Sequence, residues 1–431
     1  MKKKLLFTFF LVLGIGITYY GKHHKSDVEK LRDKHRSFLE NSPFKKTKYL
    51  SKKERIGQGL PPNAYNEQMW ELTMDPNTGR PMPERVEKLQ QELLNNRADN
   101  RGGGGDNYSA WVDRGPNNIG GRTRGIMFDP NDTDYNRVFA GGVSGGLWVN
   151  EDITNANSSW TLVPGIGANI SVTVIISDPN DSNVFYIGSG ESYTSGQAIG
   201  RGVWKSTDGG VTWSNIFGGY ESADGGQFIN GIFYVNDLVA RDVNGSTELY
   251  AAFAGAYYRG SGGNPNQFNG LNEQGFYKST DGGSNWTKFS IDESNGSPSN
   301  PNDIEIDIDN NVWFTTTRSN FGFDGGKIFR STDGTTFDLI TTIPNANRTE
   351  LEPSSTDVNK FWVAISNKDT GDADLFTTDD AFTTFSSINE PNDADNGIPS
   401  VDYTRGQAFY DLPIEVDVND NLYVGGIDLI E

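Results

Sequence analysis

Cysteine is absent from this 431-residue chain, and its three histidines, His23, His24 and His35, all lie before residue 106. The lack of cysteine excludes disulfides, thiolate metal sites and a cysteine nucleophile. The lack of histidine after residue 105 excludes a Ser-His-Asp triad and a His-ligated zinc site from most of the chain. Any catalysis there must use carboxylates, tyrosine, lysine or a hard metal ion.

Aliphatic residues are also few. Hydrophobic residues make up 35% of the chain, aromatic residues alone make up 12%, and there are 51 glycines. Few aliphatic residues, together with many aromatic, Gly, Asn, Asp and Thr residues, favour short strands joined by tight turns. The composition therefore predicts an all-β protein rather than a helical one.

Positive charge is concentrated at the N-terminus. Residues 1–105 carry a net charge of +8 and residues 106–431 a net charge of −28. Such an acidic region repels nucleic acid and anionic membrane surfaces. We therefore expect no nucleic-acid partner. The acidic surface is a solvated face in the first interpretation and a means of collecting cations in the second.

The N-terminus has the shape of a secretory signal. Lys2, Lys3 and Lys4 precede an apolar run from Leu5 to Ile17, which is short for a membrane span. No A-x-A-like cleavage site follows, so residues 1–21 are either a signal peptide or an uncleaved N-terminal anchor. The anchor would be the only route to a membrane. Either interpretation predicts a secreted or cell-surface protein.

Residues 22–105 form a connector in this interpretation. Residues 26–41 and 83–96 place apolar residues at helical spacing, and "SKKE" at 51–54 fits a capping box. The Gly-rich "RGGGGD" at 101–106 predicts a flexible joint. We expect short helices on an extended connector that ends in a Gly-rich linker.

From about Trp111 the chain repeats. Each unit has a strand, a "DPND"-type turn, a second strand, a Gly-rich loop, a third strand and a polar phrase. The phrase reads "KSTDGGVTW", "KSTDGGSNW", "RSTDGTTF" and, in decayed form from Thr377, "TTDDAFTTF". A repeat of about 40–50 residues with four short strands is typical of a β-propeller blade. We count five units and the start of a sixth near residue 403: 111–163, 170–217, 232–290, 300–342 and 347–388.

A propeller closes its ring to hide its edge strands. We therefore predict that residues 106–431 are an incomplete β-propeller and that the chain is the N-terminal part of a longer protein. The 21 residues "GAYYRGSGGNPNQFNGLNEQG" at 255–275 are predicted to be a loop insertion within the third unit.

Turn chemistry explains the polar phrase without a ligand. An Asp in a turn accepts bonds from nearby backbone N–H groups, glycine adopts positive φ, and an aromatic ring can fold back over the hairpin. The phrase therefore predicts a hairpin between the two outer strands of each blade. The residues assigned to this structural role are Ser206, Asp208, Gly210, Trp213, Ser279, Asp281, Gly283, Trp286, Ser331, Asp333 and Phe337.

The phrase resembles the Asp-box, or bacterial neuraminidase repeat, of sialidases, sortilin-type domains and xyloglucanase-like propellers. The resemblance implies a structural role at the blade periphery and implies no activity. Residues 39–84, followed by "WVDRGPNNIGGRTRGIMFDPND" at 111–132, resemble large secreted propeller proteins of Bacteroidetes. Those proteins commonly carry a type IX secretion signal, so the resemblance implies export machinery as a partner.

Two catalytic patterns can be tested against these families. Sialidases have an Arg-containing "F/YRIP" phrase that this chain lacks. Glu191 and Tyr193, two residues apart, could form a Glu–Tyr nucleophile pair on one face of a strand, or lie in an ordinary loop. "VFAGGVSGGLW" at 138–148 resembles xyloglucanase-like propellers. Val143 stands there in place of a catalytic Asp, which argues against hydrolysis by that carboxylate pair.

Arg122 and Arg124 lie where the first inner strand should begin, near the channel, and could bind a carboxylate or sulfate. The alternative is a salt bridge within the acidic domain. "DIDNN" (Asp307, Asp309, Asn311) and "DVNDN" (Asp417, Asn419, Asn421) resemble the start of a calcium loop but lack its Gly and distal Glu. We interpret both as hairpin turns and expect no cofactor, with Ca²⁺ as the weaker alternative.

These observations predict a non-catalytic surface propeller that binds glycan or protein outside the cell. The alternative is a glycoside hydrolase that works through carboxylates, sialidase-like or xyloglucanase-like. A sortilin-like receptor module is a third interpretation.

Overall fold

The computed structural model describes residues 122–430, apart from 144, 168–169, 195–197, 224–226, 259–266, 392–402 and 427–428, and a few residues between 30 and 92. The predicted signal segment 1–21 and the linker 101–106 lie outside the described residues. The chain divides into two compact units, Met1–Met82 with Arg259–Asn266, and Pro83–Tyr258 with Gln267–Glu431. No helix among the described residues is long and apolar enough to span a membrane.

The predicted capping box is present in the first unit. The Ser51 N–H and hydroxyl both donate to Glu54 Oε2, at 2.8 and 2.7 Å, and the Glu54 N–H lies 3.4 Å from Ser51 Oγ. These bonds lower the pKa of Glu54. The reciprocal pattern satisfies N–H groups that the start of a helix leaves unpaired.

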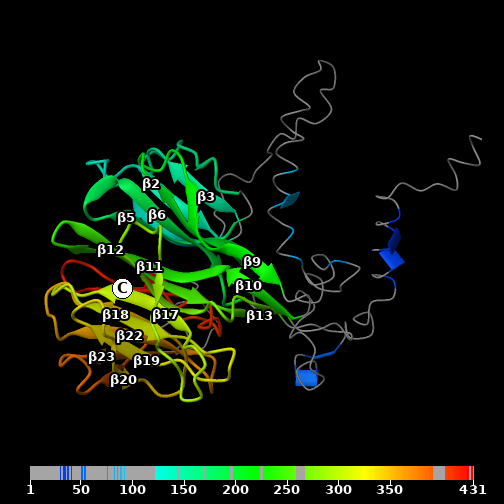
Figure 1. The fold of residues 1–431 in the computed structure, drawn as a ribbon. Coiled ribbons are helices and arrows are strands. Elements are labelled where there is room, and N and C mark those ends of the chain that lie inside the picture. The colour runs from blue at the N-terminus through cyan, green and yellow to red at the C-terminus, as the bar shows by residue number, and fades with distance from the viewer. Residues whose placement is uncertain are drawn as a thin grey trace, which may run out of the picture. The chain divides into compact units, whose positions relative to one another are not determined.

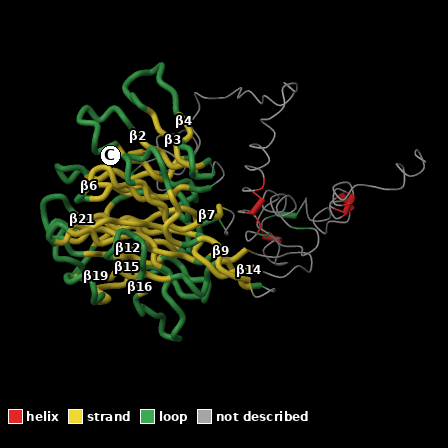
Figure 2. The backbone as a smooth tube through the Cα atoms, turned by 45° about the horizontal axis from the view of Figure 1, so that its top comes forward, coloured by secondary structure: helices red, strands yellow, loops and turns green. Residues whose placement is uncertain are grey.

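The second unit is a β-propeller, in which antiparallel sheets follow one another in chain order (Figures 1 and 2). Each of the first five blades has four strands, and the sixth sheet has three. The first three blades are β1 Thr123–Phe128, β2 Val138–Gly142, β3 Gly146–Asn150, β4 Thr161–Leu162; β5 Val172–Asp178, β6 Asp181–Glu191, β7 Ala198–Ser206, β8 Ser214–Phe217; and β11 Tyr234–Val243, β12 Ser246–Ala254, β15 Gly275–Ser279, β16 Thr287–Lys288.

The remaining blades follow the same order. They are β17 Pro301–Ile306, β18 Val312–Thr316, β19 Lys327–Ser331, β20 Asp338–Thr342; β21 Ala346–Pro353, β22 Phe361–Asn367, β23 Ala373–Thr378, β24 Ser386–Ile388; and β25 Ile414–Val416, β26 Leu422–Gly425, β27 Leu429–Ile430. The predicted five blades and partial sixth are confirmed. The sixth sheet also includes a short third strand, β27, which the sequence interpretation did not assign.

The core lies between blades, and aromatic rings fill much of it. Phe139 of the first blade meets Phe185 of the second edge to face at 5.7 Å. Phe276 of the third blade stacks on Phe314 of the fourth at 4.2 Å. Each main cluster draws buried residues from two neighbouring blades. Aromatic rings therefore fill space that aliphatic side chains fill in most cores, as expected from the low aliphatic and high aromatic content of the chain.

The repeated turn has the predicted hairpin geometry between the third and fourth strands. In the second blade Asp208 Oδ1 accepts the Thr212 N–H at 2.8 Å, and Ser206 Oγ accepts the Gly210 N–H at 2.9 Å. The Trp213 indole folds back and donates to the Gly210 carbonyl at 2.9 Å. The copies at Ser279 and Ser331 have equivalent bonds.

The decayed copy begins one residue later than predicted. Thr378, not Thr377, takes the serine position, because its hydroxyl accepts the Phe382 N–H at 3.0 Å. Asp380 Oδ1 accepts the Thr384 N–H at 2.8 Å, as Asp208 does in the intact turn. Thr377 instead donates to the Phe361 carbonyl in the sheet.

The repeated turn also joins each blade to the one before it. A Cβ at Gly210 would lie 2.7 Å from Phe139 Cζ, and one at Gly283 would lie 2.3 Å from Ile216 Cδ1. Lys205 Nζ, of the second blade, donates to the Gly282 carbonyl of the third at 3.2 Å. The lysine that opens the phrase thus reaches the next copy of the phrase.

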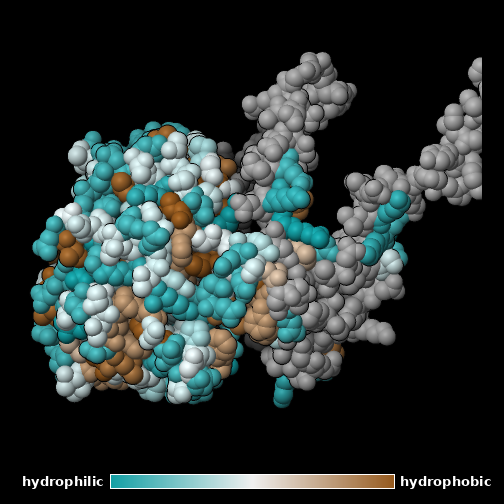
Figure 3. All heavy atoms as spheres, in the orientation of Figure 1, coloured by the Kyte–Doolittle hydropathy of each residue, from teal (hydrophilic) through white to brown (hydrophobic). Residues whose placement is uncertain are grey.

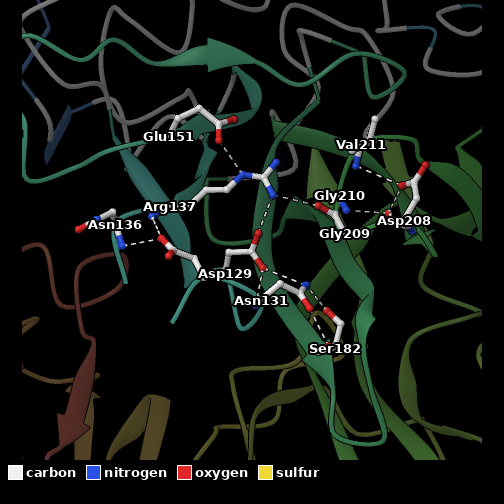
Figure 4. A network of polar contacts seen from close by, with 12 residues as sticks. Asp129, Asn131, Asn136, Arg137, Glu151, Ser182, Asp208, Gly209, Gly210 and Val211 are labelled. Carbon is white, nitrogen blue, oxygen red and sulfur yellow. Dashed lines mark hydrogen bonds and ion pairs between the residues drawn. The ribbon is translucent and has the colours of Figure 1, made fainter. Parts of the chain in front are cut away.

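Figure 4 shows the corresponding junction between the first two blades. Arg137 bonds to Asp129 at 2.6 Å and to Glu151 at 3.0 Å, and its Nη1 lies 3.4 Å from the Gly209 carbonyl of the second blade. Asn131, in the "DPND" turn, donates to the Ser182 carbonyl at 2.6 Å. Both kinds of repeated turn therefore fasten neighbouring blades.

One sheet lies outside the repeat. It comprises β9 Gly219–Ala223, β10 Phe228–Ile232, β13 Ala256–Tyr258 and β14 Gln267–Asn269. The prediction of a plain loop at 255–275 is wrong, since β13 and β14 lie within it. Both strands pair with each other, and β14 also pairs in parallel with β10. Elsewhere the surface seen in Figure 3 is mostly hydrophilic with small apolar spots, in keeping with the acidic composition.

The connectivity separates repeated turns from unrepeated loops. The first and third strands of a blade run in the same direction, so the turns that follow them lie at the same end of the sheet. The connections between second and third strands, and between blades, lie at the other end. Residues at the starts of the inner strands β1, β5, β11, β17, β21 and β25 therefore meet at that second end, and the inner strands contact one another in sequence.

Candidate functional site at the mouth of the channel

Residues far apart in sequence meet at this second end, and we call them the channel mouth: Arg124, Glu191, Tyr193, Arg348 and Tyr410. Arg348 Cζ lies 4.0 Å from the centre of the Tyr193 ring. Arg124 Cζ lies 4.8 Å from the Tyr193 ring and 4.5 Å from the Tyr410 ring. The channel mouth thus joins the first, second and fifth blades with the segment that leads into β25.

A single main-chain carbonyl links the two arginines of the channel mouth. The Tyr410 carbonyl accepts Arg348 Nη1 at 2.6 Å and Arg124 Nη2 at 3.1 Å. Arg348 is buried, and its Nε also donates to Glu350 at 2.5 Å. Arg348 is therefore neutralised, whereas Arg124 keeps donors that no carboxylate of the described residues occupies.

Both predicted arginines lie where the sequence placed them. Arg124 is in β1, and Arg122 precedes β1 with its Cζ 5.0 Å from the Tyr410 ring. Arg122 is exposed. Neither forms an ion pair with a carboxylate among the described residues, and the choice between ligand binding and a salt bridge stays a prediction. Two guanidinium groups stacked on one tyrosine can donate to an anionic group or to sugar hydroxyls.

Glu191 ends β6, where the chain is held tightly. Gly190 before it has φ +88°, and a Cβ there would lie 1.7 Å from the Phe233 carbonyl oxygen, so only glycine fits. Glu191 is 0% exposed. Its Oε2 accepts the Thr194 hydroxyl at 3.3 Å, and its Oε1 has no partner in the described structure.

Burial raises the pKa of Glu191, and the charges of Arg124 and Arg348 oppose that rise. A carboxyl with a raised pKa keeps its proton to a higher pH than a solvent-exposed carboxyl does, and its free oxygen is open to a further partner. Such a group can donate the proton to a leaving oxygen.

Tyr193 lies beyond the end of β6, so the strand alternation proposed for Glu191 and Tyr193 does not apply. The Tyr193 hydroxyl donates to Asn302 Oδ1 at 2.6 Å. Asn302 in turn donates to Glu350 Oε1 at 2.8 Å. Burial raises the pKa of Tyr193. The Tyr193 hydroxyl is thus engaged with the fourth blade rather than with Glu191.

Below Arg124 the channel holds a cavity of about 260 Å³. All six inner strands line it, and its lining contains five carboxylates and one cation, Arg124: Asp237, Asp303, Glu305, Glu350 and Glu415. The sequence interpretation missed Arg348, Glu350 and the channel carboxylates. The available signal was the alternation of charged residues in "RTELE" and "DIEID", where an inner strand of a propeller would otherwise carry small or apolar residues.

The turns resembling calcium loops use their carboxylates internally. Asp307 accepts the Asn311 N–H at 2.8 Å and the Trp313 indole N–H at 2.8 Å. Asp417 accepts the Asn419 and Asn421 N–H groups at 2.8 and 2.9 Å. Among the described residues no group of three or more His, Cys, Asp or Glu side chains is arranged to hold a metal ion.

No family model matches the chain. A xyloglucanase from a Paenibacillus species is 25% identical over 235 residues, which are 50% of this chain and 20% of that protein. Two solved GH74 enzymes, one from Niastella koreensis and one ancestral, are 19% identical, with TM-scores of 0.44 and 0.47. The matches cover 70% of this chain and 44% and 38% of those chains.

A solved YCF48 bound to D1 peptide is 15% identical with a TM-score of 0.40, and the match covers 71% of this chain and 75% of that one. The chain spans a fifth of the length of the xyloglucanase and less than half the length of the GH74 enzymes. Its sheets, paired in chain order around six inner strands, establish the chain as a β-propeller.

Proposed function

We propose that the channel mouth hydrolyses a glycosidic bond, with Glu191 as the proton donor. The observation that carries the proposal is the Glu191 carboxyl, which is fully buried, has one unpartnered oxygen and lies near two arginines. Glycoside hydrolysis requires a general acid, and burial raises the pKa of the Glu191 carboxyl in the direction that this role needs. The chemistry needs only side chains of this chain and no cofactor.

Hydrolysis also needs a second carboxylate. Asp411 supplies it in this proposal, because it follows the pinned Tyr410 carbonyl and is half-buried. Burial raises the pKa of Asp411, and Arg124 and Arg348 act against that rise. Arg348 and Arg124 thus influence both carboxyl groups. Asp411 activates water or attacks the sugar, while Glu191 protonates the leaving oxygen.

The substrate favoured by the geometry is a glycan with an acidic sugar. Arg122 and Arg124 carry guanidinium donors that no described carboxylate occupies, and an acidic sugar supplies a matching carboxylate or sulfate. The Paenibacillus relative is named a xyloglucanase, which makes a neutral β-glucan the second substrate class to test. The signal-like residues 1–21 support activity outside the cell.

The test uses the full chain on fluorogenic sialosides, uronides and β-glucan oligosaccharides. Glu191→Gln should abolish turnover on the substrate that is cleaved, whereas Glu151→Gln, an exposed carboxylate that pairs with Arg137, should not. Turnover that survives in Glu191→Gln would assign the acid elsewhere. Absence of turnover on all three classes would remove hydrolysis from consideration.

Non-catalytic glycan binding is the second candidate. The stacked arginine and tyrosine side chains of the channel mouth favour it, because they recognise an anion without any acid chemistry. A glycan array that shows binding without turnover, with binding lost in Arg124→Met and kept in Glu191→Gln, would support this function over hydrolysis.

A further inference from the structure

Carboxylates of the channel connect the inner strands of neighbouring blades. Asp237 Oδ2, on β11, accepts the Ile304 N–H of β17 at 2.8 Å. Asp303 Oδ2, on β17, accepts the Leu351 N–H of β21 at 2.6 Å. Glu352, on β21, lies near the Val416 N–H of β25, and this N–H lowers the pKa of Glu352. The same hydrogen bond thus recurs at two successive blade junctions, and a carboxyl lies near the corresponding N–H at the third.

These carboxylates face one another with little positive charge between them. The charged groups of the inner strands at or beside the cavity are Arg124 on β1, Asp237 on β11, Asp303 and Glu305 on β17, Arg348, Glu350 and Glu352 on β21, and Glu415 on β25. The other charged residues of these strands, Asp178, Arg241 and Asp242, lie at the far ends of β5 and β11. Arg348 is already paired with Glu350. Among the described residues that line the cavity, Arg124 is therefore the one cation, and it faces five carboxylates.

Like charges in a confined space cannot all ionise, so the group retains protons. Burial and the neighbouring carboxylates raise the pKa of Asp303 and of Glu305 well above the usual value. Burial and Glu415 raise the pKa of Glu352 to about 9. Burial raises the pKa of Asp237 to about 7, with Glu350 adding to the effect.

We propose that the channel carboxylates form a proton-dependent clamp, which holds the inner strands of the third to sixth blades together while protonated and loosens them as protons are lost. A protonated carboxyl still accepts an amide N–H and adds no charge to the channel. An ionised one accepts the same bond but repels its neighbours across the cavity. The clamp is independent of whether the channel mouth is catalytic.

The clamp also controls the channel mouth, because the same strands carry both. Asn302, which holds the Tyr193 hydroxyl, precedes Asp303 on β17. Arg348, which holds the Tyr410 carbonyl, lies two residues before Glu350 on β21. Separation of β17 from β21 breaks the Asn302 bond to the Thr349 carbonyl, now 2.7 Å. Loss of protons in the channel therefore disorganises the channel mouth.

The direction of the pH effect follows from linkage. An unfolded carboxyl titrates near pH 4, and these carboxyls titrate higher in the folded chain. The folded chain therefore binds more protons over the interval between the two values. Stability from the clamp is fully present below about pH 4 and is lost as pH rises toward about 9.

The test is hydrogen exchange of the full chain between pH 5 and 9, corrected for the intrinsic pH dependence of exchange. The amides of Ile304, Leu351 and Val416 should lose protection by up to about tenfold per pH unit for each proton released. The Asp303→Asn and Glu352→Gln variants should flatten this dependence, since neutral amides cannot ionise. Asp338→Asn, on the outer strand β20 of the same blade, is the matched control and should leave it unchanged.

Protection of these three amides that does not vary with pH would overturn the clamp, as would an Asp338→Asn effect equal to that of Asp303→Asn. If both channel variants fail to fold, Glu415→Gln replaces them. Glu415 lines the same cavity and burial raises its pKa, but it is more exposed than the other lining carboxylates and accepts no bond from a neighbouring blade in the described structure. A Glu415→Gln variant with the wild-type pH dependence would also overturn the proposal.

Discussion

The two ends of the blades use carboxylates in opposite ways. In the repeated turns Asp208 and Asp281 accept several donors at the surface, and those bonds lower the pKa of each to about 2. In the channel, burial and like charges raise the pKa of Asp303 and Glu352. A carboxyl group is thus easier to ionise where it accepts the bonds of a turn and harder to ionise where it lies at the channel. The carboxylates of the turns belong to a sequence phrase that recurs in successive blades. The channel carboxylates are charged residues on inner strands and do not belong to a recurring phrase.

The largest expected effect concerns the unrepeated end. Glu191→Gln should lower kcat by about 10²–10⁴-fold, the usual contribution of a general acid, because the amide is too weak an acid to protonate the leaving oxygen. The unfolding free energy should not fall, since a neutral side chain replaces a carboxyl that is costly to ionise. Steady-state kinetics and thermal melts of Glu191→Gln and Asp281→Ala check this. Asp281→Ala should show the reverse pattern, with lower stability and unchanged kcat.

The next effect concerns the repeated end. Gly283→Ala should destabilise the fold by about 2–4 kcal/mol, because its φ of +86° disfavours a side chain and the added Cβ would lie 2.3 Å from Ile216 Cδ1. Gly296→Ala is the matched control, with φ +80° and open space around the position. It should cost only the backbone term, about 1–2 kcal/mol. Equal losses in urea melts would show that the repeated turn does not press on the preceding blade.

A smaller effect is the difference in stability loss between substitutions of Lys205 and Lys278, the lysines that open two copies of the phrase. Lys205→Met removes one bond to the Gly282 carbonyl and should cost about 1 kcal/mol. Lys278→Met removes the equivalent bond to Gly334 and also a 2.5 Å ion pair with half-buried Glu248, so it should cost more. Chemical denaturation of both variants measures the difference. A greater loss in Lys205→Met would contradict the ranking.

The smallest effect is the acid limb of stability. Because the pKa of Asp208 and Asp281 is lowered in the folded chain, their contribution is present above about pH 4 and is lost as pH falls toward 2. Asp281→Asn should make the loss of stability at low pH less steep and leave the pH dependence on the alkaline side unchanged. Thermal midpoints at pH 2.5, 4 and 7 test it, and a variant effect confined to the alkaline side would reverse the comparison.

Sequence analysis predicted the repeated turns and the blades that they belong to. It missed most of the unrepeated residues that form the channel mouth and line the channel. The spacing of Ser206, Asp208 and Trp213 predicted both the hairpin and the blade count, because turn chemistry is local and recurs. Arg124 was found because it lies at the start of the first strand. Arg348 and Tyr410 were missed, because they contact Tyr193 and Arg124, which belong to other blades and lie far from them in sequence. Glu191 was identified from its neighbour Tyr193, but no local pattern in the sequence specifies its complete burial, which depends on the surrounding fold.

The decayed copy shows how far the repeated turn can drift. Ala381 and Phe382 have φ of +50° and +68°, where the intact copies have glycine. The buried Phe382 ring packs on Trp313 and Phe361 at 6.0 and 5.4 Å. Packing against the preceding blade thus compensates for the backbone cost that glycine avoids elsewhere. The hydrogen-bond frame from Thr378 and Asp380 is the part that does not change.

The contact that joins the first and sixth blades uses a main-chain acceptor. Both arginines donate to the carbonyl of Tyr410, and a substitution at position 410 would leave that oxygen in place. The acceptor side of this contact is therefore insensitive to side-chain substitution at position 410. Its donor side depends on Arg124 and Arg348. A substitution at position 410 would therefore change the ring on which Arg122 and Arg124 stack, while the carbonyl that Arg124 and Arg348 share stays in place.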